Sequence, residues 1–501
     1  MKKGFTLIEL LAVLVILVVI AAIATPIVMG IINDSKTSSD ISTVNNMLDT
    51  AEHVYAQAYL SGEIDDLIGE NLLEFEIFKM DNEPENGSVS FDSTGNTTVV
   101  LYNNGNCYVK KPGVDITYGE STLEECSVDF VGDSSGNGGS ESTNSVANAP
   151  VLGDLIPVTI AANGTVTVVE PSTKWYDYDN QEWANAIVLS SGTASTGDTF
   201  SLNDSGTYDN IDALFVWIPR YEYQIPTVTD TENPPSININ FVSSSTTNAS
   251  QDYIMHPAFT FGEAELDGIW VGKFEVTGTI ATLTTLPNVS SLRDTIVSDF
   301  YDTILNFSKD HNLSNDSHLL KNIEWGAVAY LSHSAYGNTG EIYINNNSSY
   351  ITGCGGDTAS ESESTSCKNA YGSKNDNIYN QSTTGNISGI FDMSGGASEY
   401  VMGNSNYTTK NSGFADLSSL DSKYIDIYTT ESASTAYIEG DATYETFSWY
   451  SDYPAFIYWF DPWCSRGYSY NGISYAGIFM YGRVGGGGYG SVSSRMVFVN
   501  S

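Results

Sequence analysis

The first 32 residues constrain this chain more than any other part of it. Lys2 and Lys3 stand near the start, and the apolar run from Leu10 to Ile32 carries no charge. At about 1.5 Å per residue, a helix over this run is about 35 Å long, enough to cross a bilayer core with some tilt. Glu9 directly precedes the run, and a carboxylate in hydrocarbon needs a partner. We expect this segment to enter a membrane with its lysines on the cytoplasmic side.

The segment Gly4-Phe-Thr-Leu-Ile-Glu9 resembles the leader of type IV pilins and type II secretion pseudopilins. The resemblance implies that residues 1–4 are a leader peptide, and that prepilin peptidase cuts before Phe5 and methylates the new N-terminus. It also implies that Glu9 pairs with the terminal amine of a neighbouring subunit during filament assembly. The alternative is an ordinary secretory signal peptide cleaved after Ala24, although the apolar run is longer than such peptides usually have.

Helical spacing continues beyond the apolar run. Apolar residues recur three or four positions apart at Ile41, Val44, Leu48, Ala51, Tyr55 and Ala58. Together with the run they predict one helix over residues 5–60. Alternating segments at residues 88–91, 97–102 and 107–109 predict a small antiparallel sheet, which the resemblance packs on the helix in a pilin-like module over residues 5–131. A run rich in Gly and Ser at residues 132–150 predicts a flexible linker, so residues 151–501 form a second module.

Composition favours an exported protein. The chain has 61 acidic and 19 basic side chains, a net charge of −42, so nucleic acid is a poor electrostatic partner. Four of the five cysteines fall into two pairs by spacing, Cys107 with Cys126 and Cys354 with Cys367, while Cys464 stands alone. In an exported chain the two pairs are candidate disulfides, with free thiols as the alternative.

The second module is expected to be rich in loops. Residues 213–219 and 268–277 predict strands, and residues 323–332 predict a helix. Four segments, at residues 270–277, 322–330 and 389–400 and around Arg466 and Arg495, resemble the formylglycine-generating-enzyme branch of the C-type-lectin-like fold, also called the sulfatase-modifying-factor type. The resemblance covers residues 213–501. It implies an α+β chain in which the pilin helix and its small sheet precede a C-type-lectin-like domain.

The motif residues of this resemblance are expected to be structural rather than catalytic. A fold with little regular structure needs buried side chains to satisfy its backbone, and this role is assigned to Trp325, Asp392, Glu399, Arg466 and Arg495. The namesake enzyme needs two closely spaced cysteines near its C-terminus to bind copper, whereas Cys464 has no neighbouring cysteine. We therefore expect no enzyme activity and no catalytic residue, with a membrane-anchored enzyme of this type as the alternative.

The C-terminal segment suggests binding. Residues 464–494 contain 5 Tyr, 6 Ser and 9 Gly, a composition like that of an antibody paratope. Its flanking motifs resemble the variable region of proteins diversified by diversity-generating retroelements, for which a template repeat beside the gene is the test. The candidate ligand-binding residues are Tyr468, Ser469, Tyr470, Asn471, Ile473, Tyr475, Tyr481, Arg483, Tyr489 and Ser491. In the alternative, the tyrosines pack inward around a loose glycine loop.

The expected function is that of a cell-surface, pilin-like adhesin, a minor or tip subunit, that binds an extracellular glycan or protein. Its other partners are prepilin peptidase, further pilin subunits and, before assembly, the inner membrane. A structural pseudopilin of a type II secretion system is the second alternative. No cofactor is expected, and no metal ligand is assigned; the loop at residues 374–378 could supply oxygen ligands to a structural calcium ion.

Overall fold

The computed structural model describes residues 43–128, with internal gaps, and residues 148–500 except 374–375 and 430–431. The chain divides into two compact units, residues 1–142 and 143–501. Gly4, Phe5, Glu9, the apolar run and most of the predicted linker lie outside the described residues, so their roles stay predictions. Within the described part of the chain, no helix combines the length and the apolar character that a membrane crossing needs.

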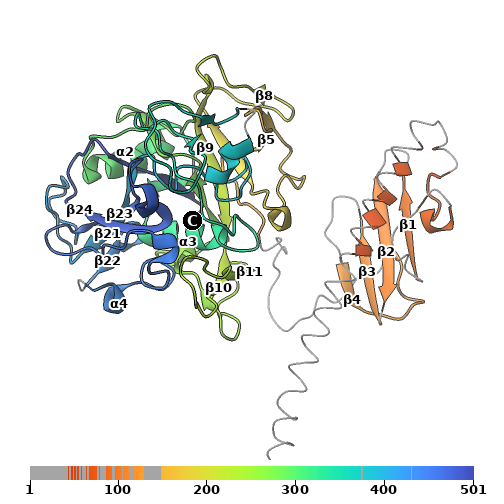
Figure 1. Cartoon of the computed structure of the whole chain (residues 1–501). Helices are drawn as coiled ribbons and strands as arrows, with labels where there is room; N and C mark the ends of the chain where they lie inside the picture. The colour runs from red at the N-terminus through yellow and green to blue at the C-terminus, as the bar shows by residue number, and fades with distance from the viewer. Residues whose placement is uncertain are drawn as a thin grey trace, which may run out of the picture. The chain divides into compact units, whose positions relative to one another are not determined.

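The first unit packs helical residues on a small sheet. The described residues between 43 and 58 are helical, and Val44, Met47, Ala51, Val54 and Ala58 are buried against the sheet in the spacing of one helix face. A short 3-10 helix, η2, covers Leu72–Glu74, and four strands follow, β1 (Gly87–Phe91), β2 (Thr97–Asn103), β3 (Asn106–Lys110) and β4 (Thr117–Glu120). They form an antiparallel meander in the order β1-β2-β3-β4 (Figure 1).

Three of these four strands coincide with the predicted segments to within a residue or two, whereas β4 was not predicted. Val89, Val99 and Tyr108 supply the buried face of the sheet. Cys107 on β3 forms a disulfide with Cys126, with a Cα–Cα distance of 5.3 Å. This bond ties the segment that follows the sheet back to its third strand.

The second unit is built around an eight-stranded antiparallel sheet in the order β18-β26-β15-β9-β7-β5-β6-β8. The strands are β5 (Ile156–Ile160), β6 (Val166–Val168), β7 (Asn185–Leu189), β8 (Thr199–Phe200), β9 (Ile211–Pro219), β15 (Gly268–Gly272), β18 (Asp316–Leu319) and β26 (Met496–Val499). The last strand of the chain, β26, lies between β18 and β15, second from one edge of the sheet. The sequence predicted β9 and β15, but not the strands between residues 156 and 200.

Both faces of this sheet are covered. Phe215 on β9 belongs to the large apolar cluster that contains helix α2 (Val297–Asp310), and the next residue back, Leu214, belongs to a second cluster with Phe274 and Phe391. Alternation along the strand explains this division, because neighbouring side chains point to opposite faces. Helix α2 was not predicted, although its buried residues Val297, Phe300, Tyr301, Ile304 and Phe307 have helical spacing in the sequence.

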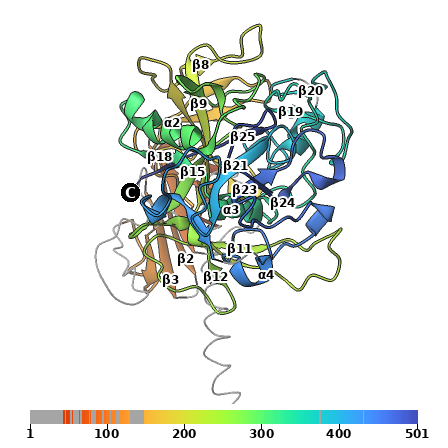
Figure 2. The same cartoon turned by 90° about the vertical axis from the view of Figure 1, so that its left-hand side faces the viewer.

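A second, five-stranded sheet lies apart from the first and carries the C-terminal segment (Figure 2). Its order is β22 (Asp426–Tyr428), β21 (Ser398–Ser405), β23 (Trp463–Gly467) and β24 (Gly477–Val484), with β25 (Val492–Ser494) also paired to β21. Helix α3 (Asn322–Ser332), the predicted helix, is buried along its whole length beside β21. It also contacts β9 of the eight-stranded sheet.

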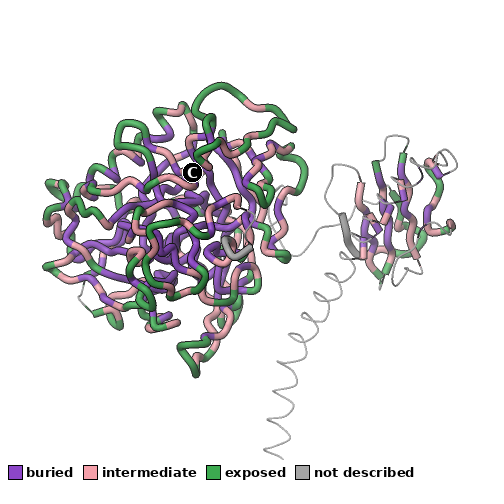
Figure 3. Tube along the Cα trace, turned by 45° about the horizontal axis from the view of Figure 1, so that its top comes forward, coloured by how far each residue is buried: buried purple, intermediate pink, exposed green. Residues whose placement is uncertain are grey.

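The remaining elements are short. Strand pairs or small sheets are formed by β10 (Tyr221–Gln224), β11 (Asn238–Phe241), β12 (Ile254–Met255), β13 (Thr260–Phe261), β14 (Ala264–Glu265), β16 (Thr277–Thr279), β17 (Thr282–Thr284), β19 (Cys354–Gly355) and β20 (Asn369–Ala370), and α4 covers Ala433–Ala436. Figure 3 shows buried segments inside and exposed loops around them. The described chain is thus mostly sheet and loop with few helices, as the predicted α+β class requires.

Large aromatic side chains and one disulfide are found in the second unit. Six tryptophans, Trp183, Trp217, Trp270, Trp325, Trp449 and Trp463, are among its largest fully buried side chains. Cys354 and Cys367 form a disulfide across the β19–β20 pair, with a Cα–Cα distance of 5.4 Å, and Cys464 is a buried free thiol. The predicted strand at residues 268–277 is shorter than expected, because β15 ends at Gly272.

Candidate ligand-binding surface

The pairing of β23 with β24 decides which side chains of the C-terminal segment are exposed. Arg466 lies opposite Tyr481, and Ser465 lies opposite Gly482. Side chains alternate between the two faces of a sheet, so each of these pairs shares a face. On the neighbouring β21, Glu399 lies opposite Arg466 and therefore belongs to the face of Arg466 and Tyr481.

The face that carries Glu399 is buried and holds a complete ion pair. The Arg495 guanidinium donates two hydrogen bonds to the Glu399 carboxylate, at 2.5 and 3.0 Å, and further ones to the Gly272 and Phe391 carbonyls at 2.8 and 3.0 Å. Both side chains are fully buried. Burial raises the pKa of Glu399 to about 7, while the Arg495 charge acts to lower it. This pair ties β21 to the end of β15.

Arg466 is likewise buried, and its contacts are with the protein. Its Nε donates to Asn322 Oδ1 at 2.7 Å, and its terminal nitrogens donate to the Ala442 carbonyl at 2.9 Å and to the Asp441 carbonyl. Asn322 is the first residue of α3. Trp325 on the same helix donates its Nε1–H to the Ile478 carbonyl of β24 at 2.7 Å. Both side chains therefore hold the helix against the sheet.

Asp392 is the fifth motif residue, and it is fully buried with a φ of 64°. Its Oδ1 accepts hydrogen bonds from Asn345 Nδ2 at 2.8 Å, from the Gly353 amide at 2.9 Å and from Gln381 Nε2 at 3.0 Å. Burial raises the pKa of Asp392, against the lowering effect of Arg495. Its carboxylate joins three loops and, like the other four motif residues, lies away from the surface.

The opposite face of the sheet opens into a depression of about 450 Å³. Ser398 on β21, Ser465 on β23 and Gly482 on β24 line it together with Val492 on β25. A Cβ at Gly482 would lie 2.8 Å from Ser465 Oγ and 2.7 Å from Met480 Cε. The absence of a side chain at this position, between small neighbours, leaves room for the depression.

Five of the ten predicted binding residues line this depression, namely Tyr468, Ser469, Asn471, Arg483 and Ser491. Tyr475 is 56% exposed, and its ring centroid lies 6.5 Å from that of Tyr468. These five residues lie within 24 positions of the sequence. The structure brings their hydroxyl, amide and guanidinium groups to one depression. They meet because the connection between β23 and β24 folds back over the sheet.

Besides Tyr475 and Tyr481, three predicted residues lie outside the lining. The Tyr470 ring packs edge-on against Tyr350, with centroids 4.9 Å apart. Ile473 is 44% exposed in the short 3-10 turn η8 (Ile473–Tyr475), and Tyr489 is 39% exposed in the glycine-rich loop before β25. These side chains are available to solvent at the edges of the same surface or beside it.

The prediction for Tyr481 was wrong. This residue is 5% exposed, and its ring lies on the buried face with the Arg466 guanidinium carbon 5.9 Å from the ring centroid. The register places Tyr481 opposite Arg466, so the alternation of β24 turns it inward. Composition alone gave it the same role as the exposed tyrosines.

The structure also adds residues that sequence reasoning missed. Tyr453, Ala455 and Asp461 line the depression. Tyr453 is 40% exposed, and its ring centroid lies 6.1 Å from that of Tyr468 and 5.9 Å from that of Tyr475. An available signal was the density of aromatic residues between positions 449 and 463, directly before the segment that was singled out.

Backbone strain occurs around this surface, as it does in other loops of the described chain. Ser448, Tyr450 and Ser451 have φ values of 60°, 55° and 64°, and Tyr468 and Ile473 have φ values of 59° and 53°. Each such non-glycine residue costs on the order of 1 kcal/mol or more, and conformations of this kind cluster at functional sites. The surrounding structure therefore holds the depression's rim in a defined shape.

Asp452 fixes one side of that rim. Its carboxylate is buried, and Oδ2 accepts a hydrogen bond from the Phe479 amide of β24 at 2.9 Å. Burial raises its pKa. A Cβ at Gly477 would come within 2.0 Å of Oδ1, so the glycine is required for this close approach. Asp452 thereby anchors the strained segment that presents Tyr453.

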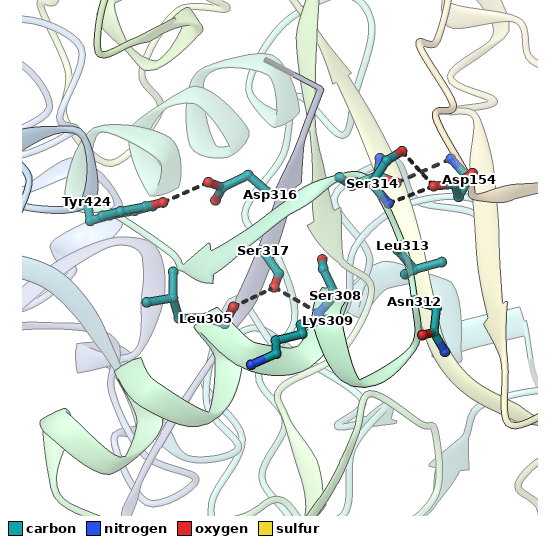
Figure 4. Close-up of a pocket in the computed structure, with 11 residues that line it drawn as sticks. Asp154, Leu305, Ser308, Lys309, Asn312, Leu313, Ser314, Asp316, Ser317 and Tyr424 are labelled. Carbon is teal, nitrogen blue, oxygen red and sulfur yellow. Dashed lines mark hydrogen bonds between the residues drawn. The ribbon is translucent and has the colours of Figure 1, made fainter.

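A larger hollow, of about 870 Å³, lies where α2 meets β18 (Figure 4). Asp154 Oδ2 there accepts hydrogen bonds from the Ser314 amide at 2.6 Å and from Ser314 Oγ at 2.5 Å, and these bonds lower the pKa of Asp154. Asp316 Oδ2 accepts from the Tyr424 hydroxyl at 2.7 Å. These carboxylates are engaged in holding loops together, and the hollow contains none of the ten predicted binding residues.

The described residues do not form a recognisable metal site. Among them, no group of three or more His, Cys, Asp or Glu side chains is arranged to hold a metal ion. Lys374 and Asn375 of the candidate calcium loop lie outside the described residues, so that suggestion stays a prediction. Burial raises the pKa of the Cys464 thiol well above its usual value.

Comparison with known proteins bears mainly on the N-terminus. Residues 1–25 match the family model described as the prokaryotic N-terminal methylation motif. This supports a type IV pilin-like N-terminus, with processing by prepilin peptidase and assembly with other pilin subunits. No curated protein matches this chain. Among solved structures, the Major Tropism Determinant I1 Variant is similar at 12% identity over 70% of this chain and 97% of that chain, with a TM-score of 0.24.

Proposed function

We propose that this chain is a pilin-like surface adhesin whose second unit is a C-type-lectin-like domain that binds an extracellular ligand. The ligand-binding surface is the depression on the open face of the five-stranded sheet, together with its aromatic rim. The chain acts as a minor or tip subunit, because a second unit of this size on every subunit would crowd a filament.

One observation carries the binding role. The same three strands that bury the Glu399–Arg495 ion pair on one face present small residues and a polar, tyrosine-rich rim on the other. Binding is strongest when little ordering is needed on contact, and a rim supported by a buried polar network meets that condition. Tyrosine adds rigid contact area that combines an apolar ring with a hydroxyl.

We further propose that the surface binds without catalysing a reaction. The depression contains Arg483 and Asp461 as its charged groups, together with hydroxyl and amide side chains. Cys464 is buried, and its raised pKa disfavours the thiolate that copper binding or nucleophilic attack would need. An assay of cysteine oxidation in a peptide, with copper supplied, is the direct test, and turnover would contradict the proposal.

The location of the variable residues supports diversification of this surface. Tyr468, Ser469, Asn471 and Tyr475 lie between β23 and β24, where substitutions leave the strand pairing intact. A connection of this kind tolerates sequence change better than the strands it joins. A second copy of the segment beside the gene, altered at these codons, is the expected finding.

Delivery and binding are tested separately. Mass spectrometry of the mature N-terminus is expected to find methylated Phe5, whereas Thr25 as first residue would mean ordinary secretion. For binding, residues 143–501 are suited to expression alone, because their apolar clusters contain no residue of the first unit. The fragment is screened against glycans, proteins and whole cells beside a Tyr468→Ala, Tyr475→Ala double variant. Equal binding by both proteins would contradict the assigned surface.

A further inference from the structure

Arg483 differs from the other arginines of the second unit. Arg220, Arg466 and Arg495 are at most 2% exposed, and Arg293 is half-buried. Arg483 is exposed on β24 at the edge of the depression. In a chain with a net charge of −42, a solvent-facing guanidinium within a candidate binding site is an unusual placement.

Two contacts hold the Arg483 side chain in place. Nη1 donates a hydrogen bond to the Phe456 carbonyl at 3.0 Å, and the guanidinium carbon lies 4.5 Å from the centroid of the Tyr458 ring. A cation over an aromatic face in this range is attracted to it. The side chain is therefore positioned before any ligand arrives, which lowers the entropy lost on binding.

The guanidinium retains donors for a ligand. Within the described part of the chain, Arg483 has no ion-pair partner, whereas the nearby Lys410 lies 3.9 Å from Asp461. Only one of its N–H groups is engaged by a described acceptor. Guanidinium presents its donors in a planar fork that matches a carboxylate in a bidentate arrangement. The N–H groups of Arg483 that have no described acceptor can therefore bind a carboxylate.

The rest of the lining suits a hydroxylated ligand. Ser465 and Ser491 supply hydroxyls to the lining. Ser398 Oγ donates to the Arg466 carbonyl at 3.2 Å and Ser469 Oγ donates to Asn471 Oδ1 at 2.7 Å, so these two hydroxyls offer acceptors and Asn471 offers its N–H groups. Tyr453 and Tyr468 add rings at the rim. A depression of about 450 Å³ falls in the size range of small-molecule sites and has room for one or two sugar rings.

We propose that the depression binds a sugar that carries a carboxylate, a deduction that rests on the proposed binding function. Arg483 binds the carboxylate through its free N–H groups, and the serine and asparagine side chains bind the ring hydroxyls. An acidic peptide would satisfy Arg483 but would leave these hydroxyl-binding groups without matching partners. The strong negative charge of the chain opposes polyanions, so the ligand is a short glycan with an isolated acidic sugar.

The test compares two oligosaccharides that differ in one group. The full chain, purified in detergent, is titrated with a glucuronic acid-terminated trisaccharide and with its glucose-terminated analogue. We expect the acidic sugar to bind at least about tenfold more tightly, the difference that a charge-assisted bidentate contact supplies. R483Q should abolish this preference while leaving the weak binding of the neutral sugar, and R483K should retain part of it.

The controls separate the possible failures. K309Q removes an exposed lysine at the larger hollow, and should bind both sugars as the unmodified chain does. Equal affinity for the two sugars, or a preference that survives R483Q, would overturn the inference. An acidic peptide is titrated in parallel. Binding to that peptide, to neutral glycans or to cells without a response to the acidic sugar refutes the sugar assignment alone, whereas absence of all binding refutes the proposed function as well.

Discussion

On one face of the five-stranded sheet Glu399, Arg466 and Tyr481 are buried, whereas on the other face Ser398, Ser465 and Gly482 line an open depression. The two sets alternate along the same strands, β21, β23 and β24. Arg495 and Arg466 on the buried face make several hydrogen bonds to protein groups, whereas Arg483 on the open face makes one, to the Phe456 carbonyl. A side chain's role in this region therefore follows from its face, and residue type alone does not reveal it.

The largest difference between the faces is expected for two arginines. Arg495→Met removes the partner of the buried Glu399 carboxylate and should lower the free energy of unfolding by about 3–5 kcal/mol. Arg483→Met, on the open face, should change it by less than about 0.5 kcal/mol. Urea unfolding followed by circular dichroism measures both. Similar losses for the two variants would mean that the faces do not differ in this way.

Two tyrosines of the same segment sharpen the comparison. Tyr481→Ala leaves a cavity beside Arg466 and should destabilise the fold by about 2–4 kcal/mol. Tyr475→Ala removes a ring that is 56% exposed, and should leave stability within about 0.5 kcal/mol while weakening ligand binding. Thermal unfolding and a binding titration on each variant suffice. A destabilised Tyr475→Ala protein would show that this ring belongs to the core.

The buried face should also carry a pH dependence. Asp426 on β22 accepts a hydrogen bond from the Ile323 amide at 2.9 Å, and burial raises its pKa from 3.8 to about 7, against the effect of the nearby Lys321. Between these values the unfolded chain is ionised at this residue while the folded chain keeps the proton. The free energy of unfolding therefore falls as pH rises from about 4 to 7.

Asp426→Asn keeps an acceptor for the Ile323 amide but does not titrate. The fall in unfolding free energy over this pH range should become smaller by up to about 4 kcal/mol, since the shift spans about three pKa units and each unit corresponds to about 1.4 kcal/mol. Chemical unfolding at intervals of one pH unit measures the free energy of unfolding. Asp461→Asn on the open face is the matched control. If the unfolding free energy of Asp426→Asn depends on pH as steeply as that of the unmodified protein, another group causes the pH dependence.

The smallest of these expected effects is a loss of ligand affinity at the floor of the depression. Gly482→Val fills the space beside Ser465 and should reduce ligand affinity at least about tenfold, which is about 1.4 kcal/mol. The new Cβ would lie 2.7 Å from Met480 Cε and 2.8 Å from Ser465 Oγ, so both side chains must shift and stability should fall by about 1 kcal/mol. A calorimetric titration beside a thermal melt measures the two quantities. Undiminished binding would remove the depression from the interaction.

Part of this organisation was readable in the sequence. The alternating segments of the first unit became β1 to β3, and residues 323–332 became α3, because local spacing already defines which face of each element is apolar. The missed strands between residues 156 and 200 lie in a stretch rich in Thr and Gly, and they are fixed by pairing with one another and, through β7, with β9. Helix α2 has helical spacing in its sequence, but its apolar face is covered only where the helix packs on β18.

The sequence by itself determined the methylation motif at the N-terminus, the cysteine pairs and the concentration of Tyr, Ser and Gly before the last strand. These properties depend on local order along the chain. Only the tertiary structure decided that Tyr481 is buried while Tyr468 is at the surface, and that Tyr453 and Asp461 join the depression. The physical reason is strand register, because a pairing between distant residues sets the face of each side chain and a shift of one position would reverse it.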